Sequence, residues 1–263
     1  MAVATSTTLL GRQVWYELMT TDMKAAEAFY KTVVGWQSAP FTGAGQPYTQ
    51  FNRGSAETSV AGVMTRPAEM KAPPFWAMYV AVPQLEEAVS KIKRLGGKTH
   101  TDVIEIPTVG RLQMLMDPQG AAFYVIEPAS QEERPEGPPQ VGEASWRELM
   151  TTDLPAAIKF YQEAFGWKPT DSMDMGEMGP YQIFNRPSGR IGGMMKKPPQ
   201  MANVPPNWQI YFRVPDVDAA AERIKANGGK ILNGPMDVPD GDRIVNAMDP
   251  QGAAFGLHSK KAK

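Results

Sequence analysis

The chain contains one short sequence twice. The six residues Glu17–Asp22 read Glu-Leu-Met-Thr-Thr-Asp, and they return unchanged as Glu148–Asp153, 131 positions later. A Phe-Tyr pair and then a Gly-Trp pair follow each copy at the same offset. The repeats of solenoid proteins are roughly 20–50 residues long, so a repeat over this distance indicates that a whole domain was duplicated.

The similarity continues through the later part of each copy. Residues 76–120 align with residues 208–252 without a gap, and both segments contain Gly-Gly-Lys and Met-Asp-Pro-Gln-Gly. A chain of 263 residues with 42% hydrophobic content can bury two ordinary cores. We predict two tandem modules at residues 8–127 and 144–259. Residues 128–143, rich in Pro, Glu and Gln, are predicted to be an exposed linker.

Each module is predicted to contain two β-α-β-β-β units. In the first unit, a strand at 13–20 precedes a helix that Asp22 caps and Gly35 ends. The remaining elements are expected from turn residues and apolar periodicity. They are strands around 36–41, 48–52, 59–65 and 75–82, a helix at 85–95 closed by Gly96-Gly97, and strands near 98–106, 111–116 and 121–126.

Composition argues against several classes of function. The net charge is −1 and no basic run is present, so we expect neither a nucleic-acid nor a membrane partner. The chain has no cysteine, which excludes disulfides and thiolate catalysis and is typical of a reducing cytoplasm. The first ten residues lack the features of a signal peptide, and no stretch approaches the roughly 18 apolar residues of a membrane helix. We therefore expect a cytoplasmic protein.

These motifs together resemble the vicinal oxygen chelate superfamily of glyoxalases, bleomycin-resistance proteins and extradiol dioxygenases. The resemblance rests on the Asp-capped helix ending Phe-Tyr, the Gly-Trp pair, Gly-Gly-Lys and the Asp-Pro-Gln-Gly turn. The tandem arrangement is similar to a group of bacterial glyoxalase-like proteins that includes a mycobacterial culture-filtrate antigen. The resemblance implies an α+β fold in which each module forms a cupped, eight-stranded mixed sheet with the helices outside.

The resemblance also implies where a divalent metal would bind. Active members of the family hold the metal in the cup with His, Gln or Glu side chains. The corresponding positions here are Trp15, Ala77 and Tyr124 in the first module and Trp146, Gln209 and Gly256 in the second. Indole nitrogen is only a donor, Ala and Gly have no side-chain ligand atom, and tyrosine ligates only as a rare phenolate. We expect no metal ligand set at these positions and no cofactor, unless a divalent ion occupies an atypical site.

Two glutamates are the candidate catalytic residues. Alternation along the first strand sends Trp15, Glu17 and Met19 toward the cup, and the equivalent carboxylate is Glu148. A desolvated Glu17 or Glu148 could act as a general base or as an anchor for a cationic or hydroxyl-bearing ligand. Alternatively, each could form half of a buried ion pair, for instance with the matched Arg111 and Arg243.

The aromatic residues also allow two interpretations. They could line pockets for a flat or apolar ligand, or they could fill the cups as core together with the 17 methionines. Trp76 and Trp208 are expected at the mouths of the cups. His258 could face the second cup, but a partly exposed terminal histidine in a strand is the favoured interpretation, because a catalytic metal needs about three protein ligands and only one is suggested. The candidate ligand-binding residues are Trp15, Tyr48, Trp76, Arg111, Tyr124, Trp146, Tyr181, Trp208, Gln209, Arg243 and His258.

Three hypotheses about function remain open. The first is a metal-independent protein that binds a small organic molecule in the cup. The second is an enzyme, which would be a glyoxalase-like lyase, an isomerase or a dioxygenase-like protein with an atypical metal site, or a metal-free catalyst that uses glutamate. The third is a scaffold whose outer faces bind protein. For assembly, we expect a monomer with internal pseudo-two-fold symmetry or a homodimer.

Overall fold

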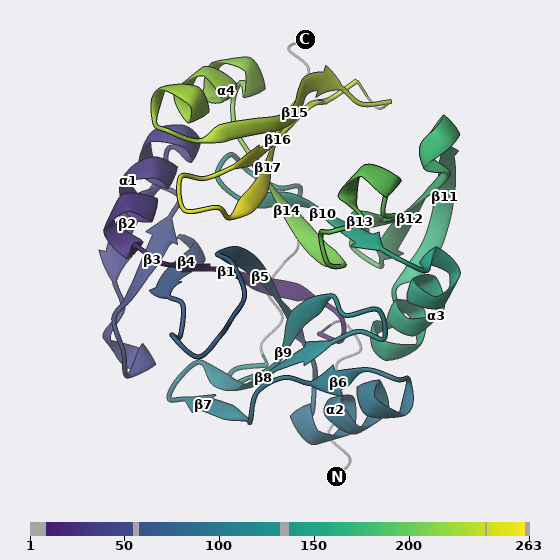
Figure 1. The fold of residues 1–263 in the computed structure, drawn as a ribbon. Coiled ribbons are helices and arrows are strands. Elements are labelled where there is room, and N and C mark those ends of the chain that lie inside the picture. Colours follow the sequence, from purple (N-terminus) through teal and green to yellow (C-terminus); the bar gives the residue numbers. More distant parts are fainter. Residues whose placement is uncertain (1–8, 55–57, 132–136, 240, 261–263) are drawn as a thin grey trace. The chain divides into compact units, whose positions relative to one another are not determined.

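The structure is a computed structural model that describes residues 9–54, 58–131, 137–239 and 241–260. Position 8 of the predicted first module and residues 132–136 of the predicted linker lie outside the described residues. The first repeat contains β1 (Gln13–Thr20), α1 (Met23–Val34), β2 (Gln37–Pro40), β3 (Tyr48–Asn52), β4 (Ser59–Thr65), β5 (Phe75–Ala81), α2 (Leu85–Arg94), β6 (Lys98–Thr99), β7 (Ile104–Ile106), β8 (Gly110–Met116) and β9 (Ala122–Pro128) (Figure 1).

The second repeat follows the same order. It contains β10 (Ala144–Thr151), α3 (Leu154–Phe165), β11 (Lys168–Asp174), β12 (Pro180–Arg186), β13 (Gly189–Lys196), β14 (Asn207–Arg213), α4 (Val217–Ala226), β15 (Lys230–Asp237), β16 (Arg243–Met248) and β17 (Ala254–Ser259). Short 3₁₀ turns lie at Thr42–Ala44, Gly176–Met178 and Pro199–Met201. The predicted α+β class with two repeated modules is confirmed.

Each repeat forms one mixed sheet. The strand order is β2-β3-β4-β1-β5-β9-β8-β6 in the first sheet, with β7 also paired to β8, and β11-β12-β13-β10-β14-β17-β16-β15 in the second. Parallel pairing joins β1 to β4 and β5 to β9, and the equivalent pairs β10–β13 and β14–β17 are also parallel. The hairpin partners are antiparallel, so both repeats show the same pairing pattern.

The helix boundaries follow the predicted caps. The side chain of Asp22 accepts a hydrogen bond from the backbone N–H of Ala25, and Gly35 ends α1 with a φ of 88°. One predicted strand, 98–106, is instead two short strands, β6 and β7. Thr101 lies between them, where its hydroxyl accepts from the N–H of Met114 and its carbonyl accepts from Gln113. These bonds replace regular ladder pairing, and the first sheet therefore has nine strands rather than eight.

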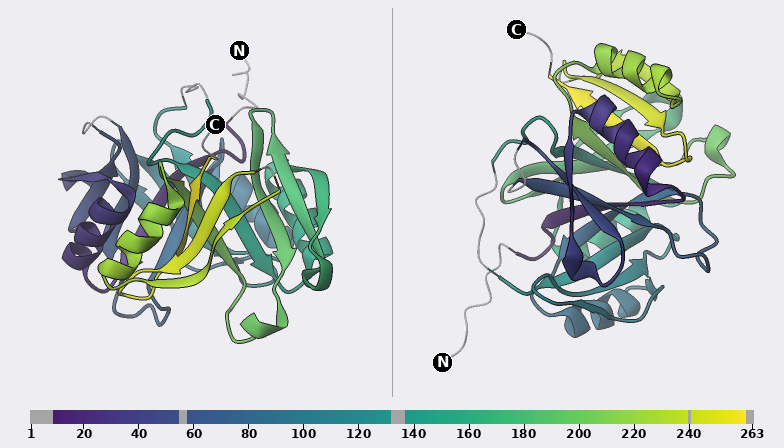
Figure 2. Two further views of the ribbon diagram at one scale, coloured as in Figure 1. Left: turned by 90° about the horizontal axis from the view of Figure 1, so that it is seen from above. Right: turned by 90° about the vertical axis from the view of Figure 1, so that its left-hand side faces the viewer.

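By packing, the chain divides into two compact units. Unit 1 comprises Met1–Val14, Met78–Gly137 and Arg147–Trp208, and unit 2 comprises Trp15–Ala77, Pro138–Trp146 and Gln209–Lys263. Each unit thus combines one half of the first repeat with one half of the second. In unit 2 this brings α1 alongside α4, as both views in Figure 2 show.

The strands of unit 2 have two distinct faces. Tyr16 on β1 packs edge-on against Phe212, with ring centroids 6.2 Å apart, on the face covered by the helices. Its neighbour Trp15 points to the opposite face, where its indole N–H donates to the hydroxyl of Tyr48. The predicted alternation along this strand is confirmed. We call the side that carries Trp15, Glu17 and Tyr48, and its equivalent in unit 1, the far face.

Candidate functional site

On the far face of unit 2, polar and aromatic residues come from three adjacent strands. Trp15 and Glu17 lie on β1, Tyr48 lies on β3, and the backbone of Glu17 pairs with that of Gly62 on β4. The indole nitrogen of Trp15 is 2.8 Å from the Tyr48 hydroxyl. Glu17 is only 4% exposed. The Tyr48 side chain lies directly over Gly62, where a Cβ would stand 2.0 Å from its hydroxyl oxygen and 2.4 Å from its ring.

The equivalent strands of unit 1 repeat this arrangement with a different hydrogen bond. Glu148 on β10 pairs with Gly193 on β13, and the ring of Tyr181 from β12 covers that glycine. The Tyr181 hydroxyl donates to a carboxylate oxygen of Glu148 at 3.0 Å. Glu148 is 9% exposed. The structure therefore joins two sequence-predicted residues, Glu148 and Tyr181, in one buried polar contact. Trp146, two residues before Glu148, is half-buried.

On the far face of β5 and β9, two tyrosines stack. Tyr79 and Tyr124 are direct neighbours in the parallel ladder, and their rings lie 4.4 Å apart with an interplanar angle of 12°. Both are nearly inaccessible to solvent. Tyr124 stands where the resemblance would place a metal-binding carboxylate, and its ring is used in this stack.

In the matching strands of the second repeat, β14 and β17, a single tyrosine fills the equivalent space. Tyr211 pairs with Gly256 in the ladder, and its ring occupies the space above the glycine, 2.2 Å from where a Cβ would stand. Next to it, the side-chain amide of Gln209 on β14 donates to the side-chain oxygen of Asn246 on β16 at 2.9 Å. The corresponding residues in the first repeat are the apolar Ala77 and Met114.

His258 lies two residues beyond Gly256 and is held at both ring nitrogens. Nδ1 is 2.9 Å from the Ser145 hydroxyl, and Nε2 is 2.8 Å from a carboxylate oxygen of Asp242. Because both nitrogens are engaged, neither is left to coordinate a metal in this arrangement. His258 instead joins the end of β17 to the start of β10 and to Asp242.

The arginines suggested as partners of the buried glutamates make other pairs. Arg111 contacts Glu86, with Glu127 3.8 Å away. Arg243 binds Asp218 and Asp237 at 2.6 and 2.9 Å, and these carboxylates raise the pKa of its guanidinium. Both arginine side chains are more than one-third exposed, at 39% for Arg111 and 34% for Arg243. The suggestion that Arg111 and Arg243 form buried ion pairs with the two glutamates is therefore wrong. These arginines form surface ion pairs with neighbouring carboxylates.

Trp76 and Trp208 lie on the helix-covered face rather than at a pocket mouth. In unit 2 the indole N–H of Trp76 donates to the hydroxyl of Tyr30, and that hydroxyl donates to Asp249 in the closing turn of the second repeat. Unit 1 repeats the chain with Trp208, Tyr161 and Asp117. Both tryptophans are buried, at 4% and 7% exposure, so packing and hydrogen bonding account for them.

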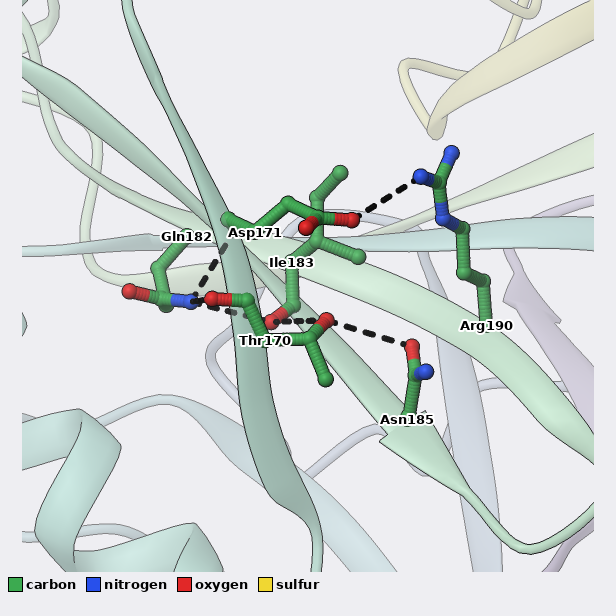
Figure 3. A network of polar contacts seen from close by, with 6 residues as sticks. All are labelled: Thr170, Asp171, Gln182, Ile183, Asn185 and Arg190. Carbon is green, nitrogen blue, oxygen red and sulfur yellow. Dashed lines mark hydrogen bonds and ion pairs between the residues drawn. The ribbon is translucent and has the colours of Figure 1, made fainter.

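Two further features do not share the buried polar and aromatic character of the far faces: an exposed polar network and a small cavity. A polar network on β11, β12 and β13 includes an Asp171–Arg190 ion pair and a Gln182 amide that bonds the carbonyls of Thr170 and Asp171 (Figure 3). It is largely exposed and lies at a bulge in an edge strand, which interrupts regular pairing there. A cavity of about 10 Å³ near Trp167 and Trp208 in unit 1 has room for about one water molecule.

Three far-face residues were not predicted from the sequence as site residues. Tyr79 and Tyr211 pair in the ladder with Tyr124 and Gly256, where the resemblance implies a carboxylate, and Asn246 bonds Gln209. A signal for Asn246 was present, because a polar residue replaces Met114 of the first repeat between the buried Val245 and Ala247. The tyrosines gave no such signal, since a tyrosine at the same position in both repeats reads equally well as core.

Comparison with known proteins agrees with the fold. The sequence matches the family described as the Glyoxalase/Bleomycin resistance protein/Dioxygenase superfamily over residues 12–125 and 144–257. It is 32% identical over 252 residues to "Putative glyoxylase CFP32" of Mycobacterium tuberculosis, covering 94% of each chain. It is 29% identical to "Anthracycline biosynthesis protein DauV" of a Streptomyces species, covering 94% of this chain and 92% of the relative.

Solved structures share the fold at low sequence identity. The Mn(II)-bound glyoxalase from Novosphingobium aromaticivorans has a TM-score of 0.65 and 17% identity, covering 95% of this chain and 82% of that one. A substrate complex of homoprotocatechuate 2,3-dioxygenase from Brevibacterium fuscum has a TM-score of 0.68 and 14% identity, covering 100% and 84%. In the described part of the chain, no helix combines the length and hydropathy needed to cross a bilayer. The matches to both repeats show that this chain belongs to the glyoxalase/bleomycin resistance protein/dioxygenase superfamily.

Proposed function

We propose that this protein binds a small organic molecule on the far faces of its sheets without the help of a divalent metal. The observation that carries the proposal is that a tyrosine ring occupies the space at the two positions, Tyr124 and Gly256, where the family would hold a carboxylate ligand. Tyr124 stacks on Tyr79, and the Tyr211 ring fills the space above Gly256. A carboxylate at Gly256 would have to displace that ring.

The remaining positions do not fit a metal either. Trp15 and Trp146 carry an indole N–H, which is a donor only, and Ala77 has no ligand atom. Gln209 has one carbonyl oxygen, but the other two positions of its repeat, Trp146 and Gly256, offer no second ligand atom, and a catalytic metal needs about three. Among the described residues, no group of three or more His, Cys, Asp or Glu side chains is arranged to hold a metal ion. This composition supports ligand binding without the family's metal-dependent chemistry.

The same surfaces suit an aromatic ligand with polar substituents. Each far face combines tyrosine rings with a buried glutamate, and unit 2 adds the indole of Trp15. Such mixtures orient flat molecules through a few hydrogen bonds. In unit 1, the Glu148–Tyr181 contact supplies a carboxylate that can accept a hydrogen bond from a ligand hydroxyl or cation. The similarity to a protein named for anthracycline biosynthesis supports a polycyclic aromatic ligand.

Titration of tag-free protein with an anthracycline, followed by tryptophan fluorescence, tests this function. We expect saturable binding that a metal chelator leaves unchanged, with less than about 0.1 equivalent of divalent metal in the purified protein. The Glu148→Gln and Tyr181→Phe variants should each weaken binding by roughly 3–10-fold, the effect of losing one hydrogen bond. Binding that appears only after metal is added would overturn the proposal.

A glyoxalase-like lyase reaction is the second candidate, because Glu148 is a buried carboxylate on the far face and a buried carboxylate can serve as a general base. The test is formation of lactoylglutathione from methylglyoxal and glutathione by metal-free protein. Turnover that disappears in Glu148→Gln would support this reaction. Equal turnover in the variant and the unmodified protein would remove Glu148 as the base.

A further inference from the structure

The two repeats differ most sharply at one place on the far face. In the second repeat, Gln209 on β14 and Asn246 on β16 form an amide–amide hydrogen bond of 2.9 Å. In the first repeat, the same two places hold Ala77 and Met114, which are 2% and 1% exposed. Polar side chains buried in a sheet are costly unless they are bonded, so a pair that only one repeat retains needs a physical reason.

The pair leaves hydrogen-bonding groups unused. The Gln209 amide N–H bonds to the Asn246 oxygen, and within the described part of the chain neither the Gln209 carbonyl oxygen nor the Asn246 amide nitrogen has a further side-chain partner. Reversing both amides gives the same result: one side chain keeps a carbonyl oxygen and the other keeps an NH2 group, and the two side chains already touch. Gln209 is 94% buried, since its exposure is 6%.

The surroundings hold this pair firmly. Asn246 pairs in the ladder with Gly256, which pairs with Tyr211, so the amides lie beside the tyrosine ring that covers the glycine. Farther along β17, His258 is fixed between Ser145 and Asp242. A rigid donor and acceptor next to each other favour a ligand that carries the complementary acceptor and donor side by side.

We propose that the Gln209–Asn246 pair in unit 2 recognises a ligand edge with an adjacent N–H or O–H donor and carbonyl acceptor, such as a lactam or a hydroxy-ketone. The Gln209 carbonyl would accept a hydrogen bond from the ligand's N–H or O–H, and the Asn246 amide would donate one to the ligand's carbonyl. This inference rests on the proposed small-molecule binding and names the ligand's chemistry and the repeat that reads it. One such site per chain is expected, because Ala77 and Met114 offer neither group.

The test compares two molecules of nearly the same shape, 2-quinolone and N-methyl-2-quinolone, by titration calorimetry. Only 2-quinolone has the lactam N–H. We expect it to bind at one equivalent per chain, about tenfold tighter than the methylated molecule, which corresponds to about 1.4 kcal/mol. In Gln209→Leu and Asn246→Leu, the two molecules should bind equally. Gln182→Leu, on the exposed network of Figure 3, is the matched control and should retain the tenfold preference.

Side-chain NMR gives an independent readout. The amide resonances lost in Gln209→Leu and Asn246→Leu identify these two groups, and both should shift on addition of 2-quinolone to the unmodified protein. Equal affinity for the two quinolones, two equivalents bound, or unshifted amides would overturn this inference. If the anthracycline still binds in that case, the general binding function stands; if no aromatic molecule binds, both proposals fail.

Discussion

At the scale of single residues, three glycines owe their identity to neighbouring tyrosines. A Cβ added at Gly62, Gly193 or Gly256 would lie 2.0–2.2 Å from an atom of Tyr48, Tyr181 or Tyr211, far inside van der Waals contact. These positions need no positive φ, so the requirement is space rather than backbone conformation. The rings are thereby locked against the strands, and their hydroxyls are held at defined places on the far face.

Replacing Gly193 tests this link between packing and the site. Gly193→Ala should lower the free energy of unfolding by about 1–3 kcal/mol, the usual cost of overpacking, because the Tyr181 ring must move. The same movement should break the Tyr181–Glu148 hydrogen bond and weaken ligand binding. Urea unfolding measures the first effect and fluorescence titration the second. Gly137→Ala is the control, since nothing lies within 4 Å of its Cβ. Equal stability of the two variants would contradict the expectation.

At the scale of elements, the repeated sequence motifs hold helices to turns. The tyrosine at the end of each Phe-Tyr motif donates to the aspartate of the Asp-Pro-Gln-Gly turn from the other repeat, Tyr30 to Asp249 at 3.1 Å and Tyr161 to Asp117 at 3.0 Å. The second oxygen of each aspartate accepts two backbone N–H groups of its own turn at 2.9 Å. Burial raises the pKa of both aspartates, although these hydrogen bonds partly oppose the shift.

The raised pKa values predict a specific pH dependence. Because the folded protein holds the proton more tightly than the unfolded chain, each aspartate's contribution to the free energy of unfolding falls as pH rises from its ordinary pKa of 3.8 through the raised folded value. The Asp117→Asn/Asp249→Asn variant lacks this contribution. Relative to that variant, the unmodified protein should therefore become more stable as pH is lowered from neutral toward 4. Urea unfolding at several pH values measures the difference, and a constant or reversed difference would refute the assignment.

At the scale of the whole molecule, packing does not follow the order of the repeats. In unit 2, the rings of Trp36 and Phe212 lie 4.8 Å apart, although one belongs to the first repeat and the other to the second. In unit 1, the indole N–H of Trp167 donates to the carbonyl of Gly11. In each compact unit, a buried tryptophan thus contacts a residue at least 156 positions away in the chain.

Separating the repeats should consequently expose both cores. When residues 1–131 and 132–263 are expressed apart, we expect neither piece alone to show the cooperative unfolding transition of the full chain, because Tyr30, Trp36 and their counterparts lose their partners. Mixing the two pieces should restore the transition, since all the contacts re-form. Circular dichroism during heating provides the measurement. Two independently stable pieces with unchanged melting temperatures would show that the contacts between repeats contribute little.

Local sequence signals predicted most of the elements. Asp22 and Gly35 bound α1 as expected, and the predicted strands 13–20, 48–52 and 59–65 coincide with β1, β3 and β4. These features depend on caps, glycine conformations and alternation, all of which act over a few residues. The break between β6 and β7 was missed, because it depends on Thr101 bonding to a strand farther along the chain.

The sequence by itself determined the duplication and the α+β class, and it shows Trp, Ala, Tyr or Gly at five of the six positions that the family resemblance implies for metal ligands, since each of these can be read from residue identity and spacing. Only the tertiary structure showed that Trp76 and Trp208 lie in the core and that Arg111 and Arg243 form ion pairs at the surface. It alone brought Gln209 to Asn246 and placed a tyrosine over each far-face glycine. The reason is physical: burial and hydrogen bonding are set by contacts between strands distant in the chain, which no local pattern encodes.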